Sequence, residues 1–409
     1  AMDLLLVGSV VAAIAKQWGL AKPVVGEIIT ANLIGMFLGA ALGGIVADRF
    51  GRKAVFTWTL LAYSLLTGLS AFAWSAAALA LIRFFAGVGL GGELPVASTL
   101  VSEFAPKERR GRTIVLLESF WAYGTVLAAL IGAVVIPTAG WRVALLIGTL
   151  PALYVFVIRR AIPESPRYLL AQGRGTEARE VAALAGIGYE APSRAARVSL
   201  GTLFAPAFAK RTVMLWLLWI SLVFSYYGIF TWLPSLLTAK GFTLQQALWL
   251  NLAIAVFQIP GYYAAAALVD RVGRKPTLVA FLACAAIGSF FFAGATLAAS
   301  PSVAAVIGWG AVIAFFNLGA WGVTYTYTPE QYPTTIRASG AGLAAGAGRL
   351  VGAFAPFVVG LMLRGLGSPY YVFVVFAAVM FAGALAVLLL GEETRAKSLE
   401  ELTETRLAA

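Results

Sequence analysis

Histidine is absent from this 409-residue chain, and cysteine occurs once, at Cys284. A single cysteine excludes a framework of disulfides, and without histidine neither a metal centre nor histidine-based catalysis is expected. Charged residues are also scarce, at 12% against 61% hydrophobic residues, whereas soluble domains typically carry about 25% charged residues. This apolar excess indicates that much of the protein surface faces lipid, and the mean hydropathy of +0.88 agrees.

Twelve apolar segments are long enough, or nearly so, to cross a bilayer as helices, which takes about 20 residues. The sequence therefore predicts an all-α membrane protein with twelve transmembrane helices, because β-barrel strands would instead alternate in polarity. The short first segment opens with AMDLLL and is interpreted as a helix whose start is missing. A signal peptide is the alternative, but its basic start and cleavage site are not seen. The predicted spans are 1–15, 24–46, 54–73, 76–101, 113–136, 141–158, 212–236, 244–268, 277–298, 302–326, 339–362 and 370–390.

The net charge of +12 would also suit a nucleic-acid-binding protein. However, most of the 30 lysines and arginines lie in alternate loops and in the C-terminal tail. The positive-inside rule then places both termini and the long loop after the sixth span in the cytoplasm. The sequence thus predicts a multi-pass protein of the cell (inner) membrane, surrounded by lipid and with no nucleic-acid partner.

Loops at matching places in the chain repeat one pattern of charges. GIVADRFGRKA follows the second predicted span, and AALVDRVGRKP follows the eighth. The loops after the fourth and tenth spans, SEFAPKERRGR and PEQYPTTIRASG, each place an acid seven residues before an arginine. This duplication predicts two pseudo-symmetric six-helix bundles at 1–158 and 212–390, with a cytoplasmic linker at 159–211 and a cytoplasmic tail at 391–409. The recurring charged residues are Asp48, Arg52, Glu103 and Arg110 in the first half and Asp270, Arg274, Glu330 and Arg337 in the second.

These eight charged residues are predicted to form a cytoplasmic gate. Asp48 and Arg52 lie one helical turn apart, as do Asp270 and Arg274. Exposed ion pairs contribute only about 0–1 kcal/mol each, so a network of them can close a passage and still open readily. Simple positive-inside charge would explain the basic residues, but not the recurring acids and glycines.

The whole chain resembles the major facilitator superfamily. The resemblance rests on the paired DRxGRK loops, on RFFAGVGLGG in the fourth span and on PESPRYL after the sixth. The tail EETRAKSLEEL is similar to that of the sugar-porter and organic-ion branches. The resemblance implies secondary transport by alternating access, with the charged loops as the gate. ATP-driven transport is disfavoured because the sequence contains no GxxxxGK[ST] loop.

Apart from charges at or near the loops, five charged residues fall inside predicted spans, namely Asp3, Arg83, Glu93, Glu118 and Arg349. Each costs about 2.5–3.5 kcal/mol to insert, so a function is the default expectation. In proton-coupled sugar porters a first-helix Asp and a fourth-helix Arg carry the coupling, and the resemblance assigns this role to Asp3 and Arg83. A static buried ion pair is the alternative. Glu93 and Glu118 are interpreted as inner-gate or interhelix hydrogen-bonding groups, with a second proton site as the alternative.

Arg349 is predicted to lie in the middle of the membrane, twelve residues after Arg337, which is about 18 Å of helix. A guanidinium is a planar fork that suits a carboxylate, so we expect Arg349 to face a central cavity. In organic anion transporters an Arg on the eleventh helix is associated with anionic substrates. The resemblance implies the same role for Arg349. The alternative is a partner acid from the other half, such as Glu118.

The segment WISLVFSYYGIFTWLPSLL lacks the paired glutamines by which sugar porters bind sugar hydroxyls, since those positions fall on Ser221 and Leu222. Aromatic residues instead predict a box in which a flat ring stacks while Arg349 takes an anion. GLGGELPVASTLVSEF, LLESFWAYG and YYGIFTWLPS are also similar to the bacterial niacin-transporter branch, which is related to synaptic vesicle glycoprotein 2. The candidate aromatic residues are Tyr226, Tyr227, Trp232, Trp121, Trp321 and Tyr325.

The sequence therefore predicts a monomeric secondary transporter that imports nicotinate or a similar aromatic carboxylate, together with protons. Transport of another organic ion or of a sugar is an alternative, as is a membrane binding protein that no longer transports. No cofactor is expected. An enzyme is disfavoured because no histidine, metal cluster or nucleophile constellation is present in the sequence.

Overall fold

In the computed structural model, residues 1–104, 110–184, 203–297, 301–332 and 336–395 are described, and all their regular elements are helices. The first half contains α1 (Met2–Trp18), α2 (Lys22–Phe50), α3 (Arg52–Ser70), α4 (Ala76–Phe104), α5 (Arg110–Ile147), η1 (Leu150–Tyr154) and α6 (Val155–Ala161). Two short helices follow, α7 (Pro166–Ala171) and α8 (Gly175–Leu184). The second half contains α9 (Pro206–Thr238), α10 (Leu244–Val256), α11 (Gln258–Arg271), α12 (Arg274–Ala295), α13 (Val303–Glu330), α14 (Arg337–Ala353), α15 (Ala355–Leu366) and α16 (Pro369–Leu390).

The prediction of a twelve-span all-α membrane protein is confirmed. Nine helical segments of the described ranges are apolar and long enough to cross a membrane by themselves. Each predicted span coincides with one helix, with two consecutive helices or with part of α5, except the sixth, which covers the end of α5, η1 and part of α6. The long helix α5 covers the fifth span and the start of the sixth, because its chain reverses at Gly140, where φ is 85°.

Two predicted spans are broken rather than continuous. The eighth span divides into α10 and α11 at Phe257, and the eleventh divides into α14 and α15 at Phe354. A proline lies shortly after each break, at Pro260 and Pro356. Proline lacks an N–H, and its ring collides with the carbonyl one turn earlier. The helix is therefore interrupted within the turn that precedes each proline.

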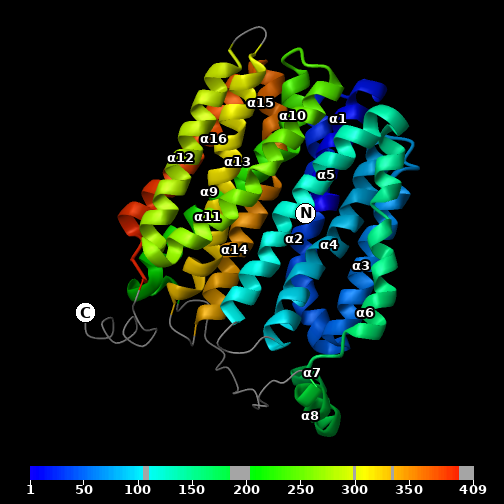
Figure 1. Ribbon diagram of the computed structural model, residues 1–409, viewed down its shortest axis with the longest axis vertical. Helices are drawn as coiled ribbons and strands as arrows, with labels where there is room; N and C mark the ends of the chain where they lie inside the picture. The colour runs from blue at the N-terminus through cyan, green and yellow to red at the C-terminus, as the bar shows by residue number, and fades with distance from the viewer. Residues whose placement is uncertain (105–109, 185–202, 298–300, 333–335, 396–409) are drawn as a thin grey trace.

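The helices form two bundles around a common centre. Figure 1 shows the first-half helices on the right and the second-half helices toward the left, with α7 and α8 below them. We call the end that carries α7 and α8 the linker end, and the other the far end. At the far end α2 meets α15 across the two halves, and an added Cβ on Gly26 would lie 2.6 Å from the carbonyl oxygen of Pro356.

Inside the first half, α2 and α4 approach each other backbone to backbone. A Cβ on Gly91 would lie 1.9 Å from the carbonyl oxygen of Met36, and one on Gly39 would lie 2.0 Å from that of Val88. Small residues repeated every four positions permit such contacts between membrane helices. The glycine spacing thus has the packing role expected from the sequence.

Replacing Gly91 by alanine is expected to destabilise the protein by at least about 1–3 kcal/mol, because a backbone oxygen has no rotamer by which to move aside. The measurement is thermal unfolding of the purified protein in detergent. Gly308→Ala is the matched control, since it lies on α13 with no atom within 4 Å of its added methyl group. Equal stability of the two variants would contradict the close packing of α2 and α4.

Candidate functional site

A cavity of about 270 Å³ lies between the two halves. Helices α2, α3, α4 and α5 line it from the first half, and α14 lines it from the second. This volume is near the lower end of the roughly 300–1,000 Å³ usual for ligand pockets, so it suits a ligand with one ring. Its charged lining residues are Glu93, Glu118 and Arg349, and Trp121 adds an aromatic wall.

Arg349 reaches this cavity from α14 and is half-buried there. Its Nη2 donates a hydrogen bond to the hydroxyl of Tyr325 on α13, at 3.1 Å. Glu118 on α5 lines the same cavity from the other half, and its charge interacts with that of Arg349. The structure thus brings Arg349 together with both an aromatic partner and the acid that the sequence offered as its alternative partner.

Five of the six candidate aromatic residues form one cluster beside Arg349. Trp121 and Trp321, from different halves, are stacked with 6.4 Å between ring centroids and 15° between planes. Trp121 Nε1 also donates to Tyr226 Oη at 2.8 Å. The rings of Tyr226, Tyr227 and Tyr325 lie 5.2, 6.4 and 6.5 Å from that of Trp321.

Trp232 lies apart from this cluster. Its Nε1 donates to the carbonyl oxygen of Pro356 at 3.0 Å, and the side chain is 2% exposed. Within the described part of the chain, none of the ring contacts joins Trp232 to the other five aromatic residues. The carbonyl of Pro356, just after the α14–α15 break, therefore accepts a donor from this indole, which is a structural use of Trp232.

Two polar residues behind the aromatic cluster were not singled out from the sequence. Tyr226 Oη donates to Gln258 Oε1 at 3.5 Å, and Thr125 Oγ1 lies 3.4 Å from the same hydroxyl. Trp121 is therefore held in place through Tyr226 by groups from both halves. A lone polar residue in an apolar span gives no periodic pattern, so the sequence offered no signal for this arrangement.

Asp3 and Arg83 form a buried ion pair, with exposed fractions of 3% and 1%. Arg83 Nη2 lies 2.6 Å from Asp3 Oδ2, and Nη1 lies 3.2 Å from Oδ1. Thr67 Oγ1 donates to Asp3 Oδ1 at 2.5 Å, and Asn32 Oδ1 accepts from Arg83 Nη2 at 3.1 Å. This network ties together α1, α2, α3 and α4, and the sequence had not indicated Thr67 or Asn32.

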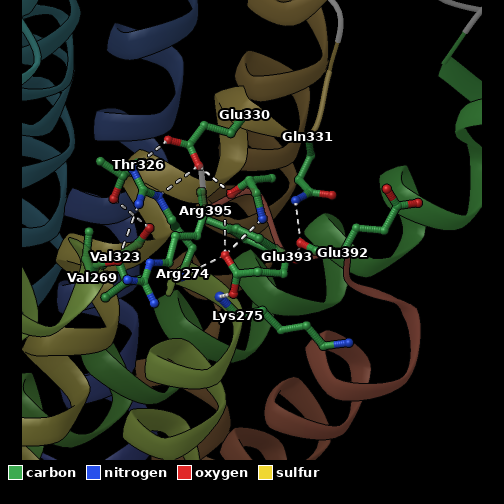
Figure 2. Close-up of polar contacts among 12 residues, drawn as sticks. Val269, Arg274, Lys275, Val323, Thr326, Glu330, Gln331, Glu392, Glu393 and Arg395 are labelled. Atoms are coloured by element: carbon green, nitrogen blue, oxygen red, sulfur yellow. Dashed lines mark hydrogen bonds and ion pairs between the residues drawn. The ribbon is translucent and has the colours of Figure 1, made fainter. Parts of the chain in front are cut away.

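At the linker end, two of the predicted gate residues form an ion pair within the second half. Arg274 Nε lies 3.2 Å from Glu330 Oε2, and Thr394 Oγ1 donates to the same oxygen at 2.5 Å (Figure 2). The guanidinium of Arg52 lies 5.7 Å from the ring centre of Tyr168. The remaining predicted gate side chains lie outside the described part of the structure, namely those of Asp48, Glu103, Arg110, Asp270 and Arg337.

A glutamate that the sequence analysis did not select caps the start of α12. Glu393 accepts hydrogen bonds from the backbone N–H groups of Arg274 and Lys275, each at 3.0 Å (Figure 2). Lys275 Nζ in turn donates to the carbonyl oxygen of Gly391 at 2.9 Å. A carboxylate at a helix N-terminus satisfies free N–H groups and complements the helix dipole.

The first half repeats this arrangement at α3. Glu164 Oε1 accepts from the backbone N–H groups of Arg52 and Lys53, at 3.0 and 3.1 Å. Lys53 Nζ donates to the carbonyl oxygen of Arg159 at 2.9 Å. The signal was present in PESPRYL and EETRAKSLEEL, which each follow the last span of a half. Those motifs had been used only as marks of resemblance.

Twelve helices in two repeated bundles, with a central cavity that receives charges from both halves, define a membrane transporter. The chain matches the Sugar (and other) transporter family over residues 12–405, and it belongs to that family. It is 47% identical to the niacin transporter NiaP of Acinetobacter baylyi, over 98% of this chain and 93% of that protein. It is 42% identical to the putative niacin/nicotinamide transporter NiaP of Bacillus subtilis, over 98% and 94%.

More distant relatives include the synaptic vesicle 2-related protein of Xenopus laevis, at 30% identity over 98% of this chain and 77% of that protein. Among solved structures, the crystal structure of the D-xylose-proton symporter has the same fold, with a TM-score of 0.75 and 20% identity over 97% of each chain. The partially occluded inward-open xylose transporter of E. coli is similar, with a TM-score of 0.74, 18% identity and 97% coverage of each chain. The resemblance to the major facilitator superfamily is thus confirmed, and the chain is a transporter rather than an enzyme.

Proposed function

We propose that this protein transports nicotinate, or a closely similar aromatic carboxylate, by alternating access. The observation that carries the proposal is the presence of Arg349 in a cavity sized for one ring, beside the stacked Trp121 and Trp321. The identity to two proteins named as niacin transporters supports it independently of that geometry.

The cavity offers one group for each part of such a substrate. The guanidinium of Arg349 takes the carboxylate, because its fork matches two carboxylate oxygens. Trp121 offers its indole face to the ring, supported by Trp321 and Tyr226. Tyr227 and Tyr325 complete the aromatic surround, while Trp232 supports the helix break behind it. A sugar lacks both the charge and the flat ring that these groups suit.

Proton coupling is proposed to use Asp3 and Arg83. Ionised Asp3 holds the guanidinium through both of its oxygens. A proton on Asp3 removes its charge and thereby releases Arg83, which loosens the contact between α1 and α4. Since a buried pair loses most of its Coulomb energy when one partner is neutralised, protonation changes the relative stability of two helix arrangements.

The linker end is proposed to face the cytoplasm of a cell whose inner membrane holds the protein as a monomer, with both termini on that side. The gate proposed from the sequence lies at this end. Arg274 and Glu330 are already paired within one half. When the linker end closes, charged residues of the two halves approach one another. The proposed gate consists of Asp48, Arg52, Glu103, Arg110, Asp270, Arg274, Glu330 and Arg337.

Uptake of labelled nicotinate into proteoliposomes, with and without an inward proton gradient, tests the proposal. Gradient-driven uptake that benzoate competes with, and xylose does not, is the expected result. Competition by xylose would contradict the assignment of the aromatic cavity. Binding of nicotinate without any uptake would instead indicate a membrane binding protein that no longer transports.

A further inference from the structure

Glu118 and Arg349 carry opposite charges into one cavity from opposite halves of the protein. Glu118 is 7% exposed on α5, and Arg349 reaches the cavity from α14. Both side chains line this cavity, so their opposite charges attract across it. They are separate from the Asp3–Arg83 pair, whose residues do not belong to the lining of this cavity. The function derived so far gives Arg349 a role and leaves Glu118 without one.

Other ionisable groups also face Glu118. They are Glu93 of α4 in the same cavity, Tyr262 of α11, Tyr325 of α13 and the amino group of Ala1. Tyr325 already accepts a hydrogen bond from Arg349 through its hydroxyl oxygen. Both tyrosines are neutral phenols near pH 7. Among the described side chains that face Glu118, Arg349 is therefore the one that carries a positive charge.

Binding of a carboxylate changes the charge balance of this cavity. Before binding, ionised Glu118 offsets Arg349. A substrate carboxylate on Arg349 would then place two anions against one side-chain cation in a largely apolar site. An uncompensated buried charge is strongly unfavourable, and a buried group neutralises rather than remaining charged and unpaired. The cavity regains its earlier net charge if Glu118 binds one proton.

We propose that Glu118 is a proton-binding site that exchanges partners with the substrate. The substrate carboxylate takes over from Glu118 as the anion that offsets Arg349, and Glu118 takes a proton from water in the cavity and becomes a neutral acid. On release of the substrate, Glu118 returns that proton to water and its charge again offsets that of Arg349 across the cavity. Each carboxylate therefore travels with one proton at Glu118, in addition to any proton carried by Asp3, and the loaded and empty cavities have the same net charge. This inference rests on the proposed carboxylate substrate.

The test is calorimetry of nicotinate binding to the purified protein in buffers with different heats of ionisation, which counts protons bound with the ligand. The wild type is expected to take up about one proton per nicotinate, so its Kd rises by up to about tenfold per pH unit wherever Glu118 is ionised in the free protein and protonated in the complex. Glu118→Gln is expected to bind nicotinate with no proton uptake and with a Kd that is independent of pH, because its amide cannot titrate.

Four further variants make the result specific. Glu27→Gln changes an exposed carboxylate of α2 in the same way and should leave proton uptake as in the wild type. Glu118→Asp keeps a titratable group, so uptake should persist in it even where Glu118→Gln folds poorly. Loss of uptake in Asp3→Asn or Glu93→Gln, with uptake retained in Glu118→Gln, would overturn the assignment.

The charge at Ala1 has its own control. A protein extended before Ala1 by uncharged residues moves the amino group out of the cavity, and proton uptake at Glu118 should persist. Nicotinate binding by the wild type without proton uptake would refute the role of Glu118 while leaving the proposed substrate intact. Absence of nicotinate binding by the wild type would refute the proposed substrate itself, and this inference with it.

Discussion

Replacing Arg349 by alanine is expected to weaken nicotinate binding by about 30-fold to a few thousand-fold. Truncating one partner of a buried, hydrogen-bonded charge pair costs about 2–5 kcal/mol, and each 1.4 kcal/mol corresponds to a factor of ten. Nicotinamide has the same ring without the negative charge, so its affinity should change little. Calorimetric titration of both ligands into wild type and variant measures the two effects side by side.

Arg349→Lys distinguishes charge from geometry. Lysine keeps the positive charge but presents a single point donor instead of a planar fork, so we expect an affinity between those of the wild type and the alanine variant. Equal losses for nicotinate and nicotinamide in Arg349→Ala would indicate that Arg349 supports the cavity structurally, through Tyr325 and Glu118, rather than binding the substrate.

Asp3→Asn is expected to stop uphill uptake of nicotinate while leaving exchange across the membrane intact. Asparagine can still accept hydrogen bonds from Arg83 and Thr67, as Asp3 does, but it binds no proton. The variant therefore resembles permanently protonated Asp3. Proteoliposomes with and without a proton gradient measure accumulation, and preloaded unlabelled nicotinate measures exchange.

The same ion pair predicts a large effect on stability when the side chain is removed. Asp3→Ala leaves Arg83 buried without its carboxylate, and breaking such a pair typically costs about 3–5 kcal/mol. Thermal unfolding in detergent should therefore rank the wild type above Asp3→Asn and Asp3→Asn above Asp3→Ala. Full coupling in Asp3→Asn, together with this ranking, would show that the pair is a static link between helices.

Much of the fold was predictable because a membrane protein alternates apolar segments of bilayer length with charged loops. Every span needs apolar length, and charged residues interrupt the chain where helices end, so the helix positions followed from composition. The breaks at Phe257 and Phe354 were missed, although Pro260 and Pro356 were visible, because membrane helices often contain proline without dividing. The boundaries at 158/159 and 211/212 stay predictions.

The site was predictable only where a residue type is costly in a membrane. Arg349 and Glu118 stood out as charges and proved to share one cavity. The partners Thr67 and Asn32 did not stand out, because a hydroxyl or amide in a span is inexpensive and the sequence does not tell which helix it faces. Trp232 resembled the other candidate aromatic residues in sequence and differs from them only through its position beside Pro356.

The glutamate caps at α3 and α12 have a consequence for how the chain could be divided. Glu164 caps α3, and Glu393 caps α12. Each capping carboxylate therefore lies on the same side of the α8–α9 connection as the helix that it caps. Glu164 lies near the start of the predicted linker at 159–211, and the part of the linker after α8 contributes neither cap. If the chain were split between α8 and α9, each of the two polypeptides would keep its glutamate cap. A protein truncated before Glu393 would lose the cap of α12. Each half therefore contains its own capping glutamate, and the start of the tail, with Glu393, supplies that of the second half.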